Sequence, residues 1–209
     1  MVTGAEAAAD RNANVPTSAP VRVGIFGGTF DPPHLGHLSA ARDVADLLAL
    51  DEVVWVPASH SPLKPDAPAT PSDLRSEMVR RTIEDEPRFR VDDRELRRSG
   101  RSFTVDTLRE MRAGSLAGAR EIVLIIGTDQ YASFDRWKEP DTIRSLASIG
   151  VMDREGVMAD ETSGIRRLPV GRVDISASVV RERVARGASL DGWVTPGVAR
   201  LIAREGLYA

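Results

Sequence analysis

The sequence contains no cysteine among its 209 residues, which excludes disulfide bonds and fits a cytoplasmic protein. A zinc site needs three or four ligands, and a chain with only three histidines and no thiol offers few, so we expect no metal site. No apolar run approaches the roughly 20 residues that span a bilayer, so we expect no membrane partner. A net charge of −3 argues against a general binder of nucleic acid.

Length and composition predict one globular domain. A chain of 209 residues, 42% hydrophobic and 28% charged, can bury a substantial core. Residues 1–20 are rich in Ala, Asn, Thr and Pro, and Glu6 and Asp10 interrupt any apolar core of a signal peptide. We therefore predict a disordered tail over residues 1–20 and a single domain over residues 21–209.

A strand, two glycines and a helix follow one another near the start of this domain. The run Val21–Phe26 is apolar and β-branched and predicts a buried strand, which ends at Gly27 and Gly28. Asp31 followed by Pro32 is typical of a helix N-cap with proline at the first helical position. In an open α/β sheet, ligands bind between such a strand end and helix start. The apolar face of the helix consists of Leu38, Ala41, Ala45 and Leu48.

This junction has the chemistry of a phosphate site. Gly27 and Gly28 lack Cβ atoms, so a ligand can approach the backbone, and the helix start adds unpaired N–H groups and a positive dipole end. His34 and His37 share one helical face there and can donate to phosphate oxygens. Taken separately, the glycines could form only a turn, and the histidines could be a surface pair or half of a metal site.

Later apolar runs continue the alternation of strands and helices. Val53–Pro57 predicts a second strand, so the unit is strand–helix–strand, which argues for a parallel sheet. Ile122–Ile126 is the most continuous apolar run and is typical of a central parallel strand. We predict the α/β class: one doubly wound, Rossmann-like domain with a parallel sheet and a small C-terminal helical segment over Val194–Leu207. Further elements are predicted at Ser72–Glu84 (helix), Phe89–Val91 (strand) and Ser148–Met152 (strand).

Two polar residues follow predicted strands at the carboxyl edge of the sheet. Lys64 lies in a proline-rich loop after the second strand, where it could reach the phosphate site or could be an ordinary solvated lysine. Asp129 follows Gly127 at the end of the central strand. Its carboxylate could accept both hydroxyls of a ribose, or it could cap the next turn.

A second candidate phosphate-binding segment lies near the C-terminus. Ser178 is a good N-cap for a helix that runs through Arg186, and this would place Arg181 in the first turn. A cation at that position opposes the helix dipole, which is expected where an anion is bound.

The stretch from Gly27 to His37 matches the G-G-T-F-D-P-x-H-x-G-H signature of the nucleotidyltransferase superfamily, and it lacks the dinucleotide-binding and P-loop glycine motifs. The chain resembles the bacterial nicotinate-nucleotide adenylyltransferases in particular, over five motifs between Val21 and about Tyr208. This resemblance implies transfer of AMP from ATP to nicotinate mononucleotide, giving deamido-NAD and pyrophosphate. It implies that Mg²⁺ is carried with ATP, and it leaves the oligomeric state open.

The resemblance also implies roles for individual residues. His34 and His37 would steady the α- and β-phosphates, while Lys64 and Arg181 would neutralise the leaving pyrophosphate. Lys64 ends a P-P-H-K-like stretch in which Leu63 replaces the usual histidine. The nucleotide-binding residues implied in this way are Gly27, Gly28, Thr29, Phe30, Gly127, Asp129, Ile175, Ser176 and Ser178.

A further implied region would hold the acceptor. Ser102, Phe103 and Thr104 resemble the S-Y-T of the family's R-x-G-x-S-Y-T-x-D-T motif, in which backbone N–H groups bind the nicotinate carboxylate. Phe103 replaces the usual tyrosine, and a backbone contact should survive that change. Trp137 stands where the family stacks an indole on the pyridine ring, although a tryptophan in such a segment is otherwise usually part of the core.

Two alternative functions remain at this point. Another H-x-G-H nucleotidyltransferase, such as phosphopantetheine adenylyltransferase, would share the histidines but not the features at Ser102–Thr104 and Trp137. A non-catalytic ATP-binding module would not need His34, His37 and Arg181, because binding alone does not require charge directed at a leaving group.

Overall fold

The computed structural model describes residues 21–59, 70–98, 100–119, 121–153, 165–171 and 173–209, so the tail predicted over residues 1–20 lies outside them. Their strands form one six-stranded, entirely parallel sheet in the order β3-β2-β1-β4-β5-β6, which confirms the predicted α/β class. The strands are β1 (Arg22–Gly28), β2 (Glu52–Pro57), β3 (Phe89–Val91), β4 (Glu121–Gly127), β5 (Ser148–Asp153) and β6 (Ile165–Pro169).

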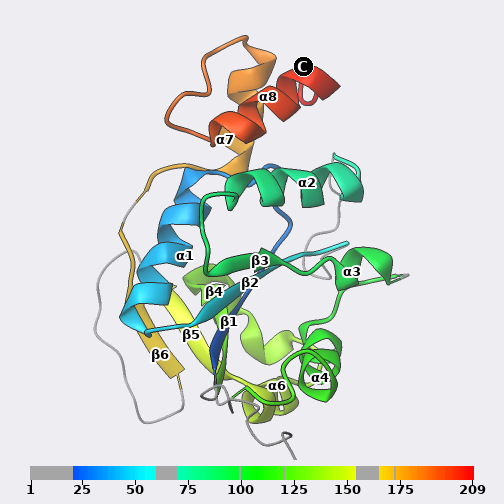
Figure 1. Ribbon diagram of the computed structural model, residues 1–209, viewed down its shortest axis with the longest axis vertical. Helices are drawn as coiled ribbons and strands as arrows, with labels where there is room; N and C mark the ends of the chain where they lie inside the picture. The colour runs from blue at the N-terminus through cyan, green and yellow to red at the C-terminus, as the bar shows by residue number, and fades with distance from the viewer. Residues whose placement is uncertain (1–20, 60–69, 99, 120, 154–164, 172) are drawn as a thin grey trace, which may run out of the picture.

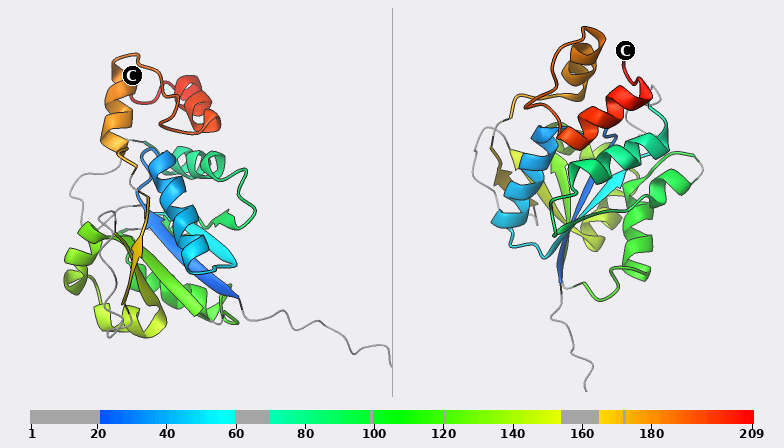
Figure 2. Two further views of the ribbon diagram at one scale, coloured as in Figure 1. Left: turned by 90° about the vertical axis from the view of Figure 1, so that its left-hand side faces the viewer. Right: turned by 45° about the horizontal axis from the view of Figure 1, so that its top comes forward.

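Helices cover both faces of the sheet, and two of them stand apart at one end (Figures 1 and 2). α1 and α2 pack on one face, whereas α4 and α6 pack on the other. α7 and α8 lie together beyond α2, at the end of the molecule that carries the C-terminus (Figure 1). The helices are α1 (Leu35–Leu47), α2 (Ser72–Thr82), α3 (Arg94–Arg97), α4 (Thr104–Ala113), α5 (Thr128–Ala132), α6 (Pro140–Leu146), α7 (Ala177–Ala185) and α8 (Pro196–Glu205), with a 3-10 turn η1 at Phe134–Arg136.

Alternating side chains of the strands build two separate cores. In β1, Val23 and Ile25 pack with α4 and α6, whereas Phe26 points to the opposite face and packs with α1 and α2. The central strand β4 is buried over its whole apolar run, as predicted for a parallel strand covered on both sides. Each fully buried apolar side chain contributes about 1.5–3 kcal/mol, so these two layers fix the positions of the strand ends.

A third apolar cluster attaches the C-terminal helical segment. Met78 on the outer side of α2 packs against Val180 of α7 and against Val198 and Ile202 of α8. The predicted helical segment over Val194–Leu207 is therefore confirmed, and it is held on α2 by its own small core.

The order of the strands defines where a ligand would bind. From β1 the chain proceeds through β2 and β3 to one edge, and then returns to β4, β5 and β6 on the other side. The boundary between β1 and β4 is thus the topological switch point, at whose carboxyl end open α/β sheets bind ligands. Gly27 and Gly28 end β1 there, and Gly127 ends β4.

The predicted start of the first helix is wrong. The N-cap is His34 rather than Asp31, and the helix begins at Leu35, so Pro32 is not its first residue. Pro33 supplies a physical reason, because a residue that precedes proline avoids the α conformation, and Pro32 is therefore held outside the helix. None of the helices that the structure describes is long and apolar enough to cross a membrane.

Candidate active site

Three segments that are far apart in the sequence are hydrogen-bonded at the carboxyl edge of the sheet. The N–H of Ala58 donates to the carbonyl oxygen of Gly28 at 2.9 Å, so the end of β2 is tied to the end of β1. One residue later, the N–H of Ser59 donates to Oγ of Ser102 at 3.1 Å. The buried Ser102 hydroxyl thus brings the segment before α4 to the same edge.

The two glycines that end β1 serve different purposes. A Cβ atom on Gly27 would meet nothing within 4 Å, so the space above its backbone is open. A Cβ atom on Gly28 would lie 2.8 Å from the ring of Phe30, which is only 2% exposed. Phe30 itself adopts a left-handed φ of 50°, which turns its side chain into the core. Its predicted contact with a nucleotide can therefore involve only the backbone.

His34 and His37 form a reciprocal cap at the start of α1. The N–H of His37 donates to Nδ1 of His34, and the N–H of His34 donates to Nδ1 of His37, both at 3.3 Å. The two rings stack with their centroids 3.7 Å apart, and His37 also lies edge-on to Phe30 at 5.2 Å. Because each Nδ1 accepts a hydrogen bond, the neutral ring carries its proton on Nε2, where it is a donor.

Gly36 lies close to a further predicted residue. An added Cβ atom would lie 3.1 Å from Nδ1 of His34 and 3.6 Å from the carbonyl oxygen of Ile175. The absence of a side chain at position 36 therefore leaves room for the His34 ring, while the carbonyl oxygen of Ile175 lies at ordinary contact distance from the same position. Ile175, predicted from the motif near the C-terminus, thus lies next to the histidine pair.

The start of α7 differs from the sequence-based prediction. Ser176 rather than Ser178 is the N-cap, and its Oγ accepts a hydrogen bond from the N–H of Val179 at 3.3 Å. Ser178 was predicted because it also suits a cap, but it lies inside the helix, exposed, with its Oγ 2.9 Å from Oγ of Ser176. Arg181 is consequently the fifth helical residue and lies just past the first turn.

Arg181 reaches back to the loop after β1. Its Nη1 donates to the carbonyl oxygen of Asp31 at 2.7 Å, which joins α7 to the glycine-rich turn across 150 residues of sequence. A guanidinium group has five N–H donors, so one bond to Asp31 leaves donors that can meet an anion. Lys64, the other predicted cation, lies outside the described residues.

Arg75 is a buried residue of this edge that the sequence reading missed. It is only 2% exposed, and its Nη1 donates to the carbonyl oxygens of Thr29 and Ala58, each at 2.7 Å. Its Nε donates to the carbonyl oxygen of Thr70 at 3.1 Å. Burial lowers the pKa of Arg75, and the nearby Asp31 carboxylate opposes that effect. The helical period could have found Arg75, since it lies three and four residues before the buried Met78 and Val79.

The predicted acceptor residues gather around the start of α4. Phe103 is the N-cap residue and Thr104 the first helical residue. Phe103 and Trp137 both pack against the core on the α4 side of the sheet, which brings them onto the same face. Nζ of Lys138 lies 4.9 Å from the centre of the Phe103 ring and 2.9 Å from a carboxylate oxygen of Asp106.

A buried carboxylate, Glu95, is hydrogen-bonded to α4 in this region, and the sequence did not predict it. Glu95 is 7% exposed, and Oγ1 of Thr107 donates to its Oε1 at 2.6 Å. Burial raises the pKa of Glu95, and the hydrogen bonds from Thr107 and Ser102, with the charge of Arg98, oppose that effect only in part. An isolated glutamate in a charged stretch gave no periodic signal of burial.

Gly127 and Asp129 lie at the end of β4, as predicted. Gly127 is the N-cap residue of α5, and its N–H donates to Oε1 of Gln130 at 3.0 Å. Asp129 is exposed in the first turn of this short helix. The structure thus places Asp129 near a helix start at the carboxyl edge of the sheet.

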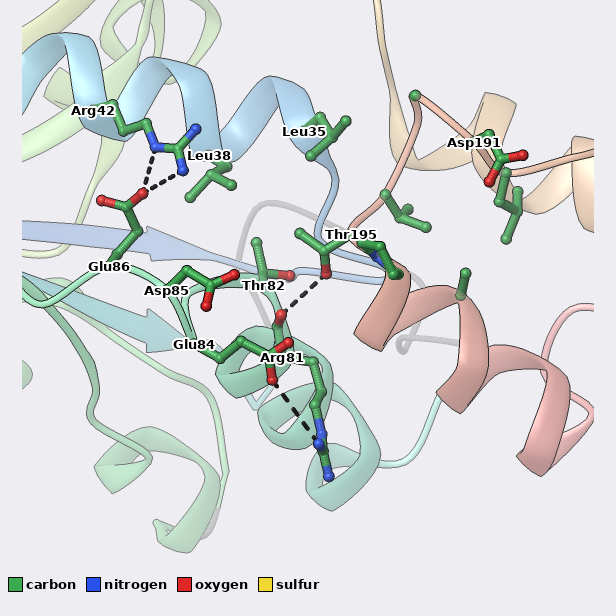
Figure 3. Close-up of a pocket in the computed structure, with 15 residues that line it drawn as sticks. Leu35, Leu38, Arg42, Arg81, Thr82, Glu84, Asp85, Glu86, Asp191 and Thr195 are labelled. Carbon is green, nitrogen blue, oxygen red and sulfur yellow. Dashed lines mark hydrogen bonds and ion pairs between the residues drawn. The ribbon is translucent and has the colours of Figure 1, made fainter.

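A separate groove, with a volume of 420 Å³, lies between the start of α1, the end of α2 and the loop before α8 (Figure 3). Arg42 and Glu86 are paired in it at 2.6 Å, and Oγ1 of Thr195 donates to the carbonyl oxygen of Arg81 at 3.0 Å. None of the predicted site residues that the structure describes lines this groove.

Protein side chains do not form a metal site in the described part of the chain, where no three His, Asp or Glu side chains are grouped to hold an ion.

The geometry is that of an α/β protein with a candidate phosphate site at its switch point, and comparison with known proteins identifies the class. The chain belongs to the cytidylyltransferase-like family, which matches residues 25–183. A protein of Shouchella clausii, named "Probable nicotinate-nucleotide adenylyltransferase", is 40% identical over 187 residues, which are 90% of this chain and 96% of that protein. A protein of Thermus thermophilus with the same name is 39% identical over 189 residues, which are 90% of this chain and 100% of that protein.

Within that class, these identities over nearly the full length show that the chain belongs to the nicotinate-nucleotide adenylyltransferase family, as the sequence motifs indicated. A solved structure of Plasmodium falciparum nicotinic acid mononucleotide adenylyltransferase complexed with NaAD shares the fold, with a TM-score of 0.73. That comparison covers 90% of this chain and 97% of the other at 18% identity, so it bears on the fold alone.

Proposed function

We propose that this protein transfers AMP from ATP to nicotinate mononucleotide and releases deamido-NAD and pyrophosphate. Its relatives in Shouchella clausii and Thermus thermophilus are named for this activity, which favours it over phosphopantetheine adenylyltransferase and over a non-catalytic ATP-binding module. We further propose that Mg²⁺ enters with ATP, where it screens phosphate charge, and that the protein works in the cytoplasm.

The reaction is an in-line displacement at the α-phosphorus of ATP. A phosphate oxygen of nicotinate mononucleotide forms the new P–O bond, while the bond from the α-phosphorus to the bridging oxygen of pyrophosphate breaks. No protein nucleophile takes part, so catalysis consists of positioning and of stabilising the charge that develops on the leaving group.

The reciprocal cap of His34 and His37 is the observation that carries this proposal. Because backbone N–H groups occupy both Nδ1 atoms, the two neutral rings carry Nε2–H donors. They stand at the start of α1, where the positive end of the helix dipole also favours phosphate. The open space above Gly27 leaves room for the phosphate chain beside them.

Further cations, hydroxyls and a carboxylate complete the nucleotide site in this proposal. Arg181 and Lys64 neutralise the leaving pyrophosphate, and Ser176 and Ser178 offer hydroxyls at the start of α7. Asp129, at the end of β4, accepts the ribose hydroxyls. The backbone of the nearby residues Gly27, Gly28, Thr29, Phe30, Gly127 and Ile175 lines the rest of the nucleotide.

Nicotinate mononucleotide would lie over the start of α4. Backbone N–H groups near Phe103 and Thr104 would bind the nicotinate carboxylate, with Ser102 holding that segment against the end of β2 through Ser59. Trp137 would stack on the pyridine ring, which contributes roughly 0.5–1.5 kcal/mol beyond the buried area.

The test is release of pyrophosphate from ATP in the presence of one acceptor at a time: nicotinate mononucleotide, nicotinamide mononucleotide or phosphopantetheine. We expect turnover with nicotinate mononucleotide and at most weak turnover with the others. Turnover with phosphopantetheine alone would identify the rival transferase. ATP binding without release of pyrophosphate in the presence of any acceptor would support the binding module and overturn the proposal.

A further inference from the structure

The C-terminal segment contacts the turn after β1 through one residue, Asp31, whose side chain and backbone both accept hydrogen bonds. Its carboxylate oxygen Oδ1 accepts a hydrogen bond from the hydroxyl of Tyr208 at 2.6 Å, across 177 residues of sequence. Its backbone carbonyl oxygen accepts the bond from Arg181 described above. Asp31 is 7% exposed, so little water competes with these two partners.

We propose that Tyr208 is a positioning residue for the proposed AMP transfer, because its hydroxyl fixes Asp31 and with it the turn between Gly28 and His34. This inference rests on the proposed function. It assigns to the C-terminal end of the chain a part in alignment of the phosphate site, in addition to its packing on α2.

The hydroxyl of Tyr208 is fully used at this place. It donates to Asp31 and accepts from Oγ1 of the buried Thr70 at 2.8 Å, so its direction is set from two sides. Burial, followed by the hydrogen bond to Asp31, raises the pKa of Tyr208. The hydroxyl is consequently protonated, and can donate, at neutral pH.

The backbone of Tyr208 supports the same conclusion. It has a φ of 64°, in the left-handed region that residues with a side chain rarely adopt. Such a conformation persists only where the surroundings over-determine it, and it is often associated with functional sites. Here the surroundings are the two hydrogen bonds of the hydroxyl and the apolar cluster between α2, α7 and α8, against which Tyr208 packs.

Asp31 also couples the turn to the buried cation beneath it. Arg75 is attracted to the Asp31 carboxylate while it binds the carbonyl oxygen of Thr29, two residues earlier in the turn. Tyr208 and Arg75 thus fix neighbouring parts of one turn, from the C-terminal segment and from α2. Removal of the hydroxyl would let the Asp31 carboxylate rotate and the turn shift, and a shift of about 1 Å near a reacting group can cost up to about 10²-fold in rate.

Kinetics of Tyr208→Phe test this role. The substitution deletes one oxygen and keeps the ring, so the fold should persist. We expect kcat to fall about 5- to 50-fold while KM for nicotinate mononucleotide stays within about twofold, because only phosphate alignment is disturbed. Thr195→Val is the matched control, since it removes a hydrogen bond of 3.0 Å between the C-terminal segment and α2 but touches no site residue. The control should retain the parent kcat.

A double-mutant cycle with Asp31→Ala separates positioning from general stabilisation. In that background Tyr208→Phe should lower kcat no further, whereas Asp31→Asn, which keeps an acceptor oxygen, should retain more activity than Asp31→Ala. A folded Tyr208→Phe protein with kcat within twofold of the parent would overturn the proposal, whether or not Asp31→Ala folds. An equal fall in Thr195→Val would also overturn it. A parent protein that is inactive with every acceptor would overturn the proposed function, and this role with it.

Discussion

The phosphate end and the acceptor end of the candidate site are held in place by different interactions. At the phosphate end, His34, Asp31 and Arg75 are 4%, 7% and 2% exposed, and each is hydrogen-bonded within the turn after β1 or across it. At the acceptor end, Phe103 and Trp137 are half-buried, and Lys138 and Asp106 form an ion pair whose side chains are 41% and 31% exposed.

This difference has energetic consequences. A surface ion pair contributes about 0–1 kcal/mol and is screened by salt, whereas removal of a partner from a buried hydrogen-bonded group costs about 1–3 kcal/mol. The phosphate end is therefore preorganised before ATP binds, and the acceptor end can adjust to its ligand. We expect substitutions at the phosphate end to lower kcat and substitutions at the acceptor end to raise KM.

The largest effect is expected for His37. His37→Ala should reduce turnover by about 10²–10⁴-fold without loss of the fold, because it removes a donor to the phosphates. His37→Asn keeps an acceptor at the position of Nδ1 and so keeps the cap, but it lacks the Nε2 donor. Steady-state rates should show His37→Ala and His37→Asn to be slow. A third variant, His37→Gln, can place an amide N–H near the position of Nε2 and should retain more activity than either. A His37→Asn rate near that of the parent would restrict His37 to a structural role.

Arg181 should produce the next largest effect. Arg181→Ala should weaken ATP binding by about 10- to 100-fold and AMP binding far less, because charge-assisted bonds to the outer phosphates are lost. Isothermal titration with both nucleotides measures the difference. Arg186→Ala, on the exposed end of the same helix, is the control and should leave both affinities unchanged. Equal losses for ATP and AMP would place Arg181 away from the outer phosphates.

At the acceptor end, Trp137→Ala should raise KM for nicotinate mononucleotide by about 3- to 30-fold with a small change in kcat, because stacking and buried area are lost. Trp137→Phe keeps an aromatic face, so its KM should lie between those of Trp137→Ala and the parent. If kcat fell as steeply as in His37→Ala while KM stayed constant, the contrast between the two ends would disappear.

The smallest effect is expected for Glu95, and it depends on pH. The pKa of Glu95 is raised in the folded protein, so the folded state holds this proton more tightly than the unfolded state does, and ionisation of Glu95 lowers the stability as pH rises. Glu95→Gln removes this charge. Its melting temperature relative to the parent should therefore be higher at pH 8 than at pH 4.5. A relative loss at pH 8 would show that the hydrogen bonds from Thr107 and Ser102 and the charge of Arg98 together outweigh burial.

The sequence predicted the elements whose signals are local. The apolar runs of β1 and β4 and the glycines at the end of β1 follow from short-range periodicity and turn chemistry, and the structure places them as expected. The two histidines do meet at the start of α1, but His34 is its N-cap and not, as predicted, a residue on the same helical face as His37. The cap of α1 was misassigned because two prolines shift the helix start to Leu35.

The contacts that fix the site were not predictable in the same way. The bond between Tyr208 and Asp31 spans 177 residues, and the bond between Arg181 and Asp31 spans 150. Such pairs depend on how α7 and α8 pack on α2, which no local pattern encodes. Arg75 is an intermediate case, because its position on the apolar face of α2 marked it as buried although its partners could not be known.

The most direct test of the account is the ratio of kcat/KM for nicotinate mononucleotide to kcat/KM for nicotinamide mononucleotide in the unmodified protein. Backbone N–H groups near Phe103 and Thr104 would bind a carboxylate by charge-assisted hydrogen bonds, roughly twice as strong as neutral ones, but would meet the N–H₂ of an amide as donor against donor. We predict a strong preference for nicotinate mononucleotide, which Trp137→Ala should leave largely intact because both rings stack alike. Equal use of the two acceptors would contradict the assignment of the substrate.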